Sequence, residues 1–189
     1  VIFGLPGEEN SDFMIALLDS PIQFVTCRHE LTASFMADAY GRLTGRPGVC
    51  LSTLGPGSTN LITGVANANM DNVPLIAIIG QAATDRLHKE SHQNMDSVAM
   101  YTPVTKWATS IRDPETIPEI IYKAFKIAVA DRPGAVLIEL PEDIAKKQVS
   151  KEPLQTPTNL EPCHSYPCVD AALKFIANAK APLLLVGPG

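Results

Sequence analysis

A carboxylate, a carboxamide and a glycine-rich turn in the first sixty residues of this sequence are of types that bind polar ligands. Glu30 follows the apolar run 22–27 and begins a helical pattern, and Asn60 lies just beyond Gly55-Pro56-Gly57. A helix N-terminus offers free N–H groups and a positive dipole end to such ligands. Acids are also common in first helical turns. Glu30 is therefore either an ordinary helix-start acid or a carboxylate directed into a site.

The elements that must position these residues alternate between strand and helix. Strands are expected at 1–3, 22–27, 49–54, 75–79 and 135–140, with a short one at 105–109, and helices at 8–18, 30–43, 58–69 and 114–130. The strand runs are continuously apolar, which is typical of a parallel sheet covered on both faces. This rhythm predicts an α/β fold, a flavodoxin-like doubly wound parallel sheet with helices on both faces. The helix 30–43 is apolar nearly all round, which predicts that both its sides are covered.

Polar or glycine-rich segments follow several of these strands, and the carboxyl ends of parallel strands share the edge where ligands bind. The segments are Gly4-Leu5-Pro6-Gly7, Arg28-His29-Glu30, Gly55-Pro56-Gly57 with Asn60, and Gly80-Gln81 with the polar loop that carries Gln93. The glycine-rich turns contain no Lys or Arg. Such a set suits a neutral heterocycle better than a phosphate.

A dinucleotide site fits less well, because its fingerprint needs a third glycine and an acid about 20 residues further on. Asn60 stands where that glycine would be, and the next strand ends in Gly80-Gln81. Two glycines for a tight turn would explain Gly55 and Gly57. They would not explain an amide one turn into the helix, where it lowers helix propensity.

Composition limits the class of protein. The chain has 189 residues, 46% of them hydrophobic and 19% charged, which is ordinary for a globular domain. A net charge of -5 and a pI near 5.3 argue against a nucleic-acid or anionic-membrane partner. No apolar run approaches the ~18 residues of a membrane span. The chain begins with Val1 and not with Met, which is compatible with a missing N-terminus.

The four cysteines indicate reduced thiols in a cytoplasmic protein. Cys27 and Cys50 lie in apolar runs, where Cys behaves as a small buried hydrophobe. Cys163, His164 and Cys168 resemble metal ligands superficially. They are only three, and their spacing fits no zinc pattern, so no metal site is predicted.

We expect three parts along the chain: a first domain at 1–145, a proline-rich linker at 146–168, and the start of a truncated central domain at 169–189. A helix at 169–179 and a strand at 182–186 are expected in the last part. The chain is thus expected to be a fragment.

Several blocks resemble the N-terminal pyrimidine-binding domain of thiamine-diphosphate-dependent enzymes, with acetolactate synthase and acetohydroxyacid synthase large subunits as the most similar group. The blocks are Gly4-Leu5-Pro6-Gly7-Glu8-Glu9-Asn10, Arg28-His29-Glu30, Ala37-Asp38-Ala39-Tyr40-Gly41-Arg42, Thr53-Leu54-Gly55-Pro56-Gly57-Ser58-Thr59-Asn60 and His92-Gln93-Asn94-Met95-Asp96. The resemblance covers about residues 1–145.

The resemblance implies roles for individual residues. Glu30 would hydrogen-bond N1′ of the aminopyrimidine of the cofactor, and Gln93 would lie near the reacting centre unless it is an ordinary polar loop residue. The catalytic residues would be Glu30 and Gln93, and the cofactor-binding residues Pro6, Gly7, Glu30, Thr53, Pro56 and Asn60. The enzyme would decarboxylate pyruvate and join the resulting enamine to a second 2-oxo acid. This task requires Glu30 to be largely shielded from water.

The resemblance also implies partners and cofactors. Thiamine diphosphate would be accompanied by Mg²⁺, held by a C-terminal domain on a Gly-Asp-Gly motif that this sequence lacks. FAD is a further candidate, with its site mainly beyond Gly189. The active site would lie between subunits of a homodimer or homotetramer that acts on small 2-oxo acids, and this fragment alone would be inactive. Alternatives are another thiamine-diphosphate-dependent 2-oxo acid decarboxylase or oxidase, or a non-catalytic flavodoxin-like binding module.

Overall fold

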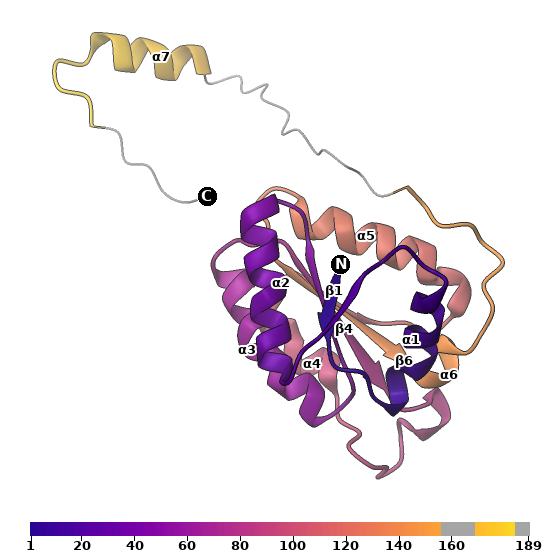
Figure 1. Ribbon diagram of the computed structural model, residues 1–189. Helices are drawn as coiled ribbons and strands as arrows, with labels where there is room; N and C mark the ends of the chain where they lie inside the picture. Colours follow the sequence, from indigo (N-terminus) through magenta and orange to yellow (C-terminus); the bar gives the residue numbers. More distant parts are fainter. Residues whose placement is uncertain (156–168, 184–189) are drawn as a thin grey trace. The chain divides into compact units, whose positions relative to one another are not determined.

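The computed structural model of the chain describes residues 1–155 and 169–183 and divides into two compact units, Val1–Thr158 and Asn159–Gly189 (Figure 1). In the second unit, a helix α7 spans Val169–Asn178, where a helix was expected. Residues 156–168 of the expected linker and 184–186 of the expected last strand lie outside the described residues.

The first unit is organised around one sheet of six strands, all parallel, in the order β2-β1-β3-β4-β6-β5. The strands are β1 (Ile2–Gly4), β2 (Phe24–Thr26), β3 (Gly48–Ser52), β4 (Leu75–Gln81), β5 (Trp107–Ser110) and β6 (Ala135–Pro141). This confirms the predicted α/β fold. The chain runs from β1 to β2 on one side and then returns to β3 on the other. The strand order therefore reverses between β1 and β3, and the carboxyl ends of these two strands form the switch point at which such sheets bind ligands.

Helices cover both faces of the sheet (Figure 1). They are α1 (Ser11–Leu18), α2 (Glu30–Thr44), α3 (Pro56–Met70), α4 (Ser97–Tyr101), α5 (Ile117–Val129) and α6 (Glu142–Ala145), with short 3₁₀ turns at Glu8–Asn10, Thr84–Arg86, Thr102–Val104 and Pro114–Thr116. The buried residues of α2, α3 and α4 pack in one cluster with one face of the sheet. Buried residues of α5 and α6, with partly buried residues of α1, pack on the opposite face. This is the doubly wound arrangement that the strand pattern predicts.

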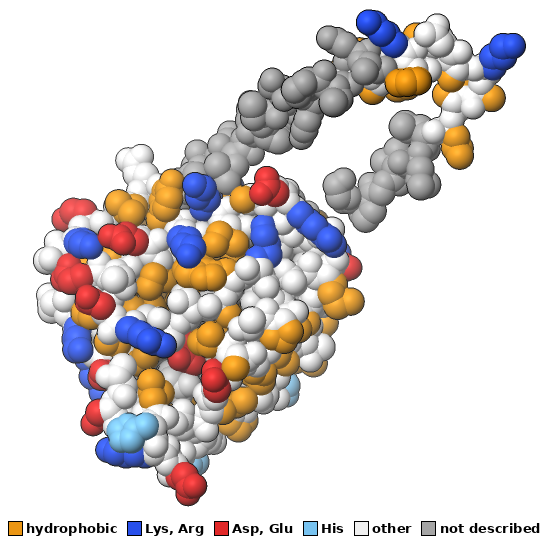
Figure 2. All heavy atoms as spheres, turned by 180° about the vertical axis from the view of Figure 1, so that it is seen from behind, with side chains coloured by type: hydrophobic (Ala, Val, Ile, Leu, Met, Phe, Trp, Pro, Cys, Tyr) orange, Lys and Arg blue, Asp and Glu red, His pale blue; other side chains and the backbone are white. Residues whose placement is uncertain are grey.

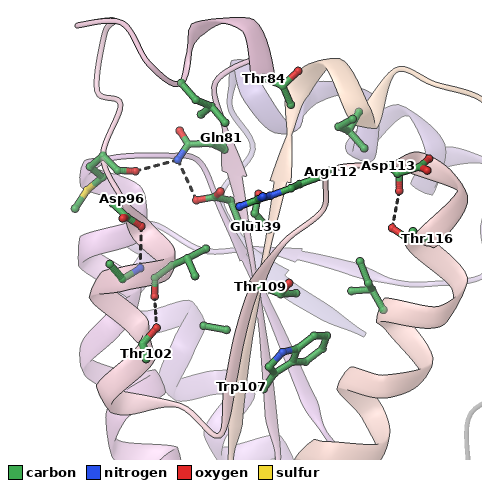
Figure 3. A pocket seen from close by; sticks show the side chains of 18 of the residues that line it. Gln81, Thr84, Asp96, Thr102, Trp107, Thr109, Arg112, Asp113, Thr116 and Glu139 are labelled. Atoms are coloured by element: carbon green, nitrogen blue, oxygen red, sulfur yellow. Dashed lines mark hydrogen bonds between the residues drawn. The ribbon is translucent and has the colours of Figure 1, made fainter.

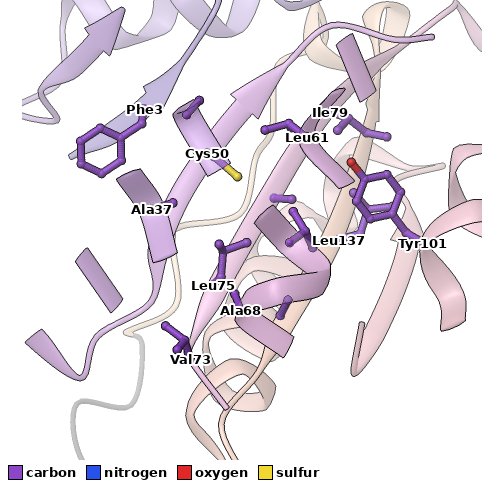
Figure 4. Packing of buried hydrophobic residues seen from close by; sticks show 14 of the residues in the cluster. Phe3, Ala37, Cys50, Leu61, Ala68, Val73, Leu75, Ile79, Tyr101 and Leu137 are labelled. Atoms are coloured by element: carbon purple, nitrogen blue, oxygen red, sulfur yellow. The ribbon is translucent and has the colours of Figure 1, made fainter. Parts of the chain in front are cut away.

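Figure 4 shows the cluster on the α2–α3 side. Ala33 and Ala37 are completely buried, and their small side chains let α2 approach the sheet closely. Leu61 of α3 and Leu75 of β4 fill the space beside them. Each fully buried Leu side chain stabilises the fold by about 2 kcal/mol. The core therefore holds α2 and α3 firmly, and both helices begin at the carboxyl edge of the sheet.

The structure corrects one expectation about α2. Leu31, Phe35 and Leu43 lie along its length and are exposed, Leu43 to 87%. On the face seen in Figure 2, basic and acidic side chains are interspersed with apolar ones.

Several element boundaries differ from the predicted ones for local reasons. Pro56 begins α3 two residues earlier than expected, because proline at the first helical position is already in helical conformation. The edge strand β2 has only three residues, and Ile22, expected to lie in it, is exposed. Ser150 and Lys151, placed in the predicted linker, bond to Glu115 just before α5 and to Glu119 in its first turn. In the described part of the chain, no helix has the length and apolar character needed to span a bilayer.

Candidate functional site

The side chains of Glu30 and Asn60 meet at the switch-point edge of the sheet. Glu30 is the first residue of α2, and Asn60 lies one turn into α3. The Asn60 Nδ2 donates a hydrogen bond of 3.0 Å to Glu30 Oε2. The half-buried carboxylate is thereby held by an amide from a neighbouring helix, which explains why an amide occupies this helical position.

The N-terminus of α2 is capped by another residue. His29 has extended backbone angles, and its Nδ1 accepts a hydrogen bond of 3.1 Å from the Leu31 N–H. An N-cap side chain normally satisfies one of the free N–H groups of a helix start in this way. The capping task is therefore done by His29, and the Glu30 carboxylate is available for Asn60 and for a ligand.

The second oxygen of Glu30 faces a stretch of bare backbone. A Cβ added to Gly57 would lie 3.5 Å from Glu30 Oε1 and 2.6 Å from Thr53 Oγ1. Glycine therefore leaves a space beside the carboxylate that any other residue would fill. A flat heterocycle with a ring nitrogen to share a proton with Glu30 fits this donor and acceptor set.

The turn after β1 borders the same space. Gly7 lies so close to Thr53 that an added Cβ would come within 2.3 Å of Thr53 Cγ2. Asn10, which is buried, accepts a 2.9 Å hydrogen bond from the Gly7 N–H and donates one of 3.2 Å to the Leu5 carbonyl. Asn10 thus holds the turn in place. The sequence predicted Asn10 only as part of the helix 8–18, and its one distinguishing signal was a carboxamide three residues after the Pro6-Gly7 turn.

The two proline residues of the predicted site are exposed. Pro6 lies in the turn between β1 and Gly7, and Pro56 is the first residue of α3. Their places beside Gly7 and Gly57 put both at the rim of the space next to Glu30.

Gln93 reaches this edge from a different part of the chain. Its backbone is left-handed, with φ of 56°, and its side chain is exposed. A Cβ added to Gly55, which itself has φ of 53°, would lie 2.7 Å from the Gln93 carbonyl oxygen and 2.8 Å from its Cβ. The loop that carries Gln93 therefore packs directly on the turn that begins α3.

A large cavity, of about 1260 Å³, lies elsewhere, beside β5 and between α4 and α5. Figure 3 shows Gln81 and Glu139 at its inner wall and Trp107 further down. The Lys123 ammonium sits 4.1 Å from the centre of the Trp107 ring. Glu30 is not among the residues that line this cavity. We place the candidate site at Glu30 because the chemically useful side chains converge there.

Metal ligands are not clustered in residues 1–155 and 169–183: no group of three or more His, Cys, Asp or Glu side chains there could hold an ion. Cys163, His164 and Cys168 lie outside the described residues. Cys27 and Cys50 are free and buried, as their apolar surroundings predicted.

Fold and site together define a doubly wound α/β domain with a carboxylate–carboxamide pair at the switch point of its sheet. Residues 1–100 match the family model described as "Thiamine pyrophosphate enzyme, N-terminal TPP binding domain". The chain belongs to this family.

The relatives of the chain are proteins named as acetolactate synthases or their large subunits, and they are about three times as long as the chain. It is 41% identical over 189 residues to "Acetolactate synthase, catabolic" of Raoultella terrigena, covering 98% of this chain and 34% of that protein. It is 38% identical over 196 residues to "Probable acetolactate synthase large subunit" of Methanocaldococcus jannaschii, covering 100% of this chain and 33% of that protein. "Acetolactate synthase isozyme 2 large subunit" of Escherichia coli is 37% identical, with coverages of 100% and 34%. The chain thus spans about a third of the length of these relatives.

Proposed function

We propose that this chain is the pyrimidine-binding part of a thiamine-diphosphate-dependent carboligase that decarboxylates pyruvate and joins the remaining two-carbon unit to a second 2-oxo acid. The observation that carries the proposal is the Glu30–Asn60 pair beside the bare backbone of Gly57, at the switch point of a domain of the thiamine pyrophosphate family. The printed names of relatives matched over the whole chain support the acetolactate-forming reaction.

Thiamine diphosphate, when bound, supplies a nucleophilic carbon and accepts the electron pair released by decarboxylation. The residues of this chain would bind and orient its aminopyrimidine. Glu30 would share a proton with the ring nitrogen N1′ through Oε1, the oxygen that faces Gly57. Asn60 holds Oε2 and so fixes the plane of the carboxylate. A proton shared at a fixed distance is what general acid–base catalysis needs.

Thr53, Gly7, Pro6 and Pro56 would form the wall against which the pyrimidine ring rests. Thr53 is half-buried and touches both turns, after β1 and before α3. Gln93 would contact substrate at the open side, since its side chain is exposed and its backbone lies on Gly55. A carboxamide can both donate to and accept from a 2-oxo acid.

The remaining parts of the active site would come from outside this chain. We propose that a C-terminal domain binds the diphosphate through Mg²⁺, that two subunits of a homodimer or homotetramer form each site, and that FAD is a candidate further cofactor. The 189-residue chain alone would then be inactive. The cytoplasmic location and the lack of nucleic-acid and membrane partners stay predictions.

A product assay tests the proposal. The full-length enzyme, supplied with pyruvate, thiamine diphosphate and Mg²⁺, is expected to form acetolactate, with the same protein lacking thiamine diphosphate as control. Acetaldehyde as the main product would instead support a simple 2-oxo acid decarboxylase. No consumption of pyruvate or another 2-oxo acid would point to the non-catalytic binding module.

A further inference from the structure

Gln81 and Glu139 form a buried polar pair at the carboxyl edge of the sheet, on strands that neither carry nor flank Glu30. Their residues are only 2% and 5% exposed. Ile79 of β4 pairs with Glu139 of β6, so Gln81, two residues further along, points to the same face as Glu139. The Gln81 Nε2 donates a 2.9 Å hydrogen bond to Glu139 Oε2 (Figure 3). A buried pair of this kind needs a reason, because burying polar groups lowers stability unless each is bonded.

The amide of Gln81 uses both of its N–H donors and also accepts a hydrogen bond at its oxygen. Besides Glu139, its Nε2 donates a 3.0 Å hydrogen bond to the Met95 carbonyl, and its Oε1 accepts one of 2.9 Å from the Ala82 N–H. Glu139 takes one of the two amide hydrogens and thereby directs the other at Met95. Only a carboxamide can do this, because a carboxylate has no hydrogen to donate.

The bond to Met95 ties the sheet to the Gln93 loop, which we define as residues 82–96. Met95 comes two residues after Gln93, whose backbone packs against Gly55. The outer part of the loop, from Thr84 to Glu90, is exposed. The tie made by Gln81 is therefore placed where it can control how Gln93 sits on the Gly55 turn.

The segment after the loop is held to the same turn. Asp96 caps α4 by accepting a 2.9 Å hydrogen bond from the Ala99 N–H. The Tyr101 hydroxyl, completely buried in α4, donates a 2.7 Å hydrogen bond to the Ser58 carbonyl in the first turn of α3. Burial raises the pKa of Tyr101, so the hydroxyl keeps the proton that it donates. The loop is thus held against α3 after Asp96, and near its start Thr84 bonds to Asp143 and Arg86 pairs with Glu142. Gln81 holds the part between these anchors, next to Gln93.

We propose that Gln81 and Glu139 are positioning residues that hold the Gln93 loop against the Gly55 turn, so that Gln93 meets the substrate. The inference rests on the proposed function, because it takes from that function the contact between Gln93 and a 2-oxo acid. Neither residue of the pair touches substrate itself. Glu139 orients the amide of Gln81, and Gln81 holds Met95.

The test exchanges donors and acceptors in the full-length enzyme. Gln81→Glu removes both donated hydrogen bonds, and Gln81→Met does the same without adding charge, in case two facing carboxylates prevent folding. Glu139→Gln keeps an acceptor for Gln81. The swap, Gln81→Glu with Glu139→Gln, restores a hydrogen bond inside the pair with its direction reversed, but provides no donor for Met95. Gln23→Glu, at an exposed position, is the matched control.

Four quantities are measured: hydrogen exchange of the amides at 91–96, the thermal midpoint, kcat, and the dissociation constant of thiamine diphosphate. Gln81→Glu and Gln81→Met should speed loop exchange by about tenfold or more and lower kcat similarly, because the hydrogen bond to Met95 is lost. Thiamine diphosphate affinity should stay within about threefold, since the loop does not hold the Glu30–Asn60 pair. Glu139→Gln and Gln23→Glu should match the wild type in loop exchange, kcat and thiamine diphosphate affinity.

The swap distinguishes a role of Gln81 in positioning the loop from a role that needs only a satisfied buried pair. It should recover thermal stability relative to Gln81→Glu while loop exchange stays fast and kcat stays low. Slow exchange and normal kcat in the swap would overturn the inference, as would unchanged loop exchange in Gln81→Glu and Gln81→Met. If the wild type forms no acetolactate but the exchange pattern holds, the proposed function fails and the positioning of the loop stands. If acetolactate forms and the exchange pattern fails, only the inference is lost.

Discussion

Two adjacent side chains at the start of α2 make different hydrogen bonds. His29 caps the helix, and Glu30 accepts a hydrogen bond from Asn60 instead. A carboxylate that also satisfied the helix N-terminus would be a weaker partner for a ligand proton, because bonds to its charged form favour ionisation. The division explains how a first-turn acid can serve as the functional group of a site.

Glu139 shows the opposite situation, an acid whose surroundings disfavour its charge. Burial raises the pKa of Glu139 above its ordinary 4.5, although hydrogen bonds from Ser110 and Gln81 oppose the change. The Asp96 carboxylate raises this pKa further and the Arg112 guanidinium lowers it. Figure 3 shows Arg112 pointing toward Glu139.

A pH dependence of stability follows from the raised pKa of Glu139. In the unfolded chain Glu139 ionises near 4.5, while the folded chain keeps the proton to higher pH. Its contribution to stability is therefore full below that value and is lost as the pH rises through the folded pKa, by about 1.4 kcal/mol for every pH unit that separates the folded pKa from the unfolded one. We expect the unfolding free energy of the wild type, measured with urea from pH 4 to pH 8, to fall relative to that of Glu139→Gln.

The exposed substitution Glu8→Gln provides the baseline for this comparison. Its difference from the wild type should stay flat over the same range. A difference between wild type and Glu139→Gln that is flat, or that changes in favour of the wild type with rising pH, would contradict the assignment.

Among the elements, the end of α5 is held by a single side chain. Lys106, just before β5, donates to the carbonyl oxygens of Ile127, Ala130 and Arg132 at 2.6, 2.8 and 2.7 Å. A cation at a helix C-terminus is favoured by the dipole and by the free carbonyl groups. The ammonium therefore holds the turn that leads from α5 into β6, the strand that carries Glu139.

Replacing Lys106 with Met keeps its apolar stem and removes all three hydrogen bonds. Because the lysine is exposed, we expect a loss of only about 1–2 kcal/mol. That corresponds to roughly 2–8 °C in the thermal midpoint of a domain of this size. The control is Lys126→Met, an exposed lysine on α5 itself. Equal midpoints for the two variants would show that the three carbonyl contacts add nothing.

The sequence predicts these elements better than their arrangement. Continuous apolar runs identify the strands, because a strand buried on both faces needs apolar residues throughout. No local sequence pattern predicts the position of β6 between β4 and β5, since this position depends on pairing between segments far apart in the chain. The helix α6, at Glu142–Ala145, is too short to show a period.

The same limit applies to the site. Glu30 and Asn60 could be predicted because each stands beside a strand end that faces the ligand-binding edge. The Gln81–Glu139 pair could not, because its members are 58 residues apart and each alone reads as a polar residue at the end of an apolar strand. A charged residue inside the otherwise apolar run Ala135–Pro141 was the one available sign.

In the molecule as a whole, we propose that the completed site draws on more than this chain. The loops of the switch-point edge converge on Glu30. Relatives matched over nearly the whole chain are about three times as long. We therefore interpret the edge around Glu30 as one half of a site, which binds the heterocycle, while the other half holds the diphosphate.

Turnover of the Glu30→Gln variant in the full-length enzyme tests the central claim most directly. Glutamine has nearly the same shape and can still accept the hydrogen bond from Asn60, but it cannot share a proton with N1′. We expect kcat to fall by at least about a hundredfold, the usual size of general acid–base catalysis, while the thermal midpoint and the product of the residual reaction stay unchanged. The exposed substitution Glu8→Gln should leave kcat at the wild-type value. Near-normal turnover of a folded Glu30→Gln enzyme would contradict the assignment of Glu30 as the acid of the site.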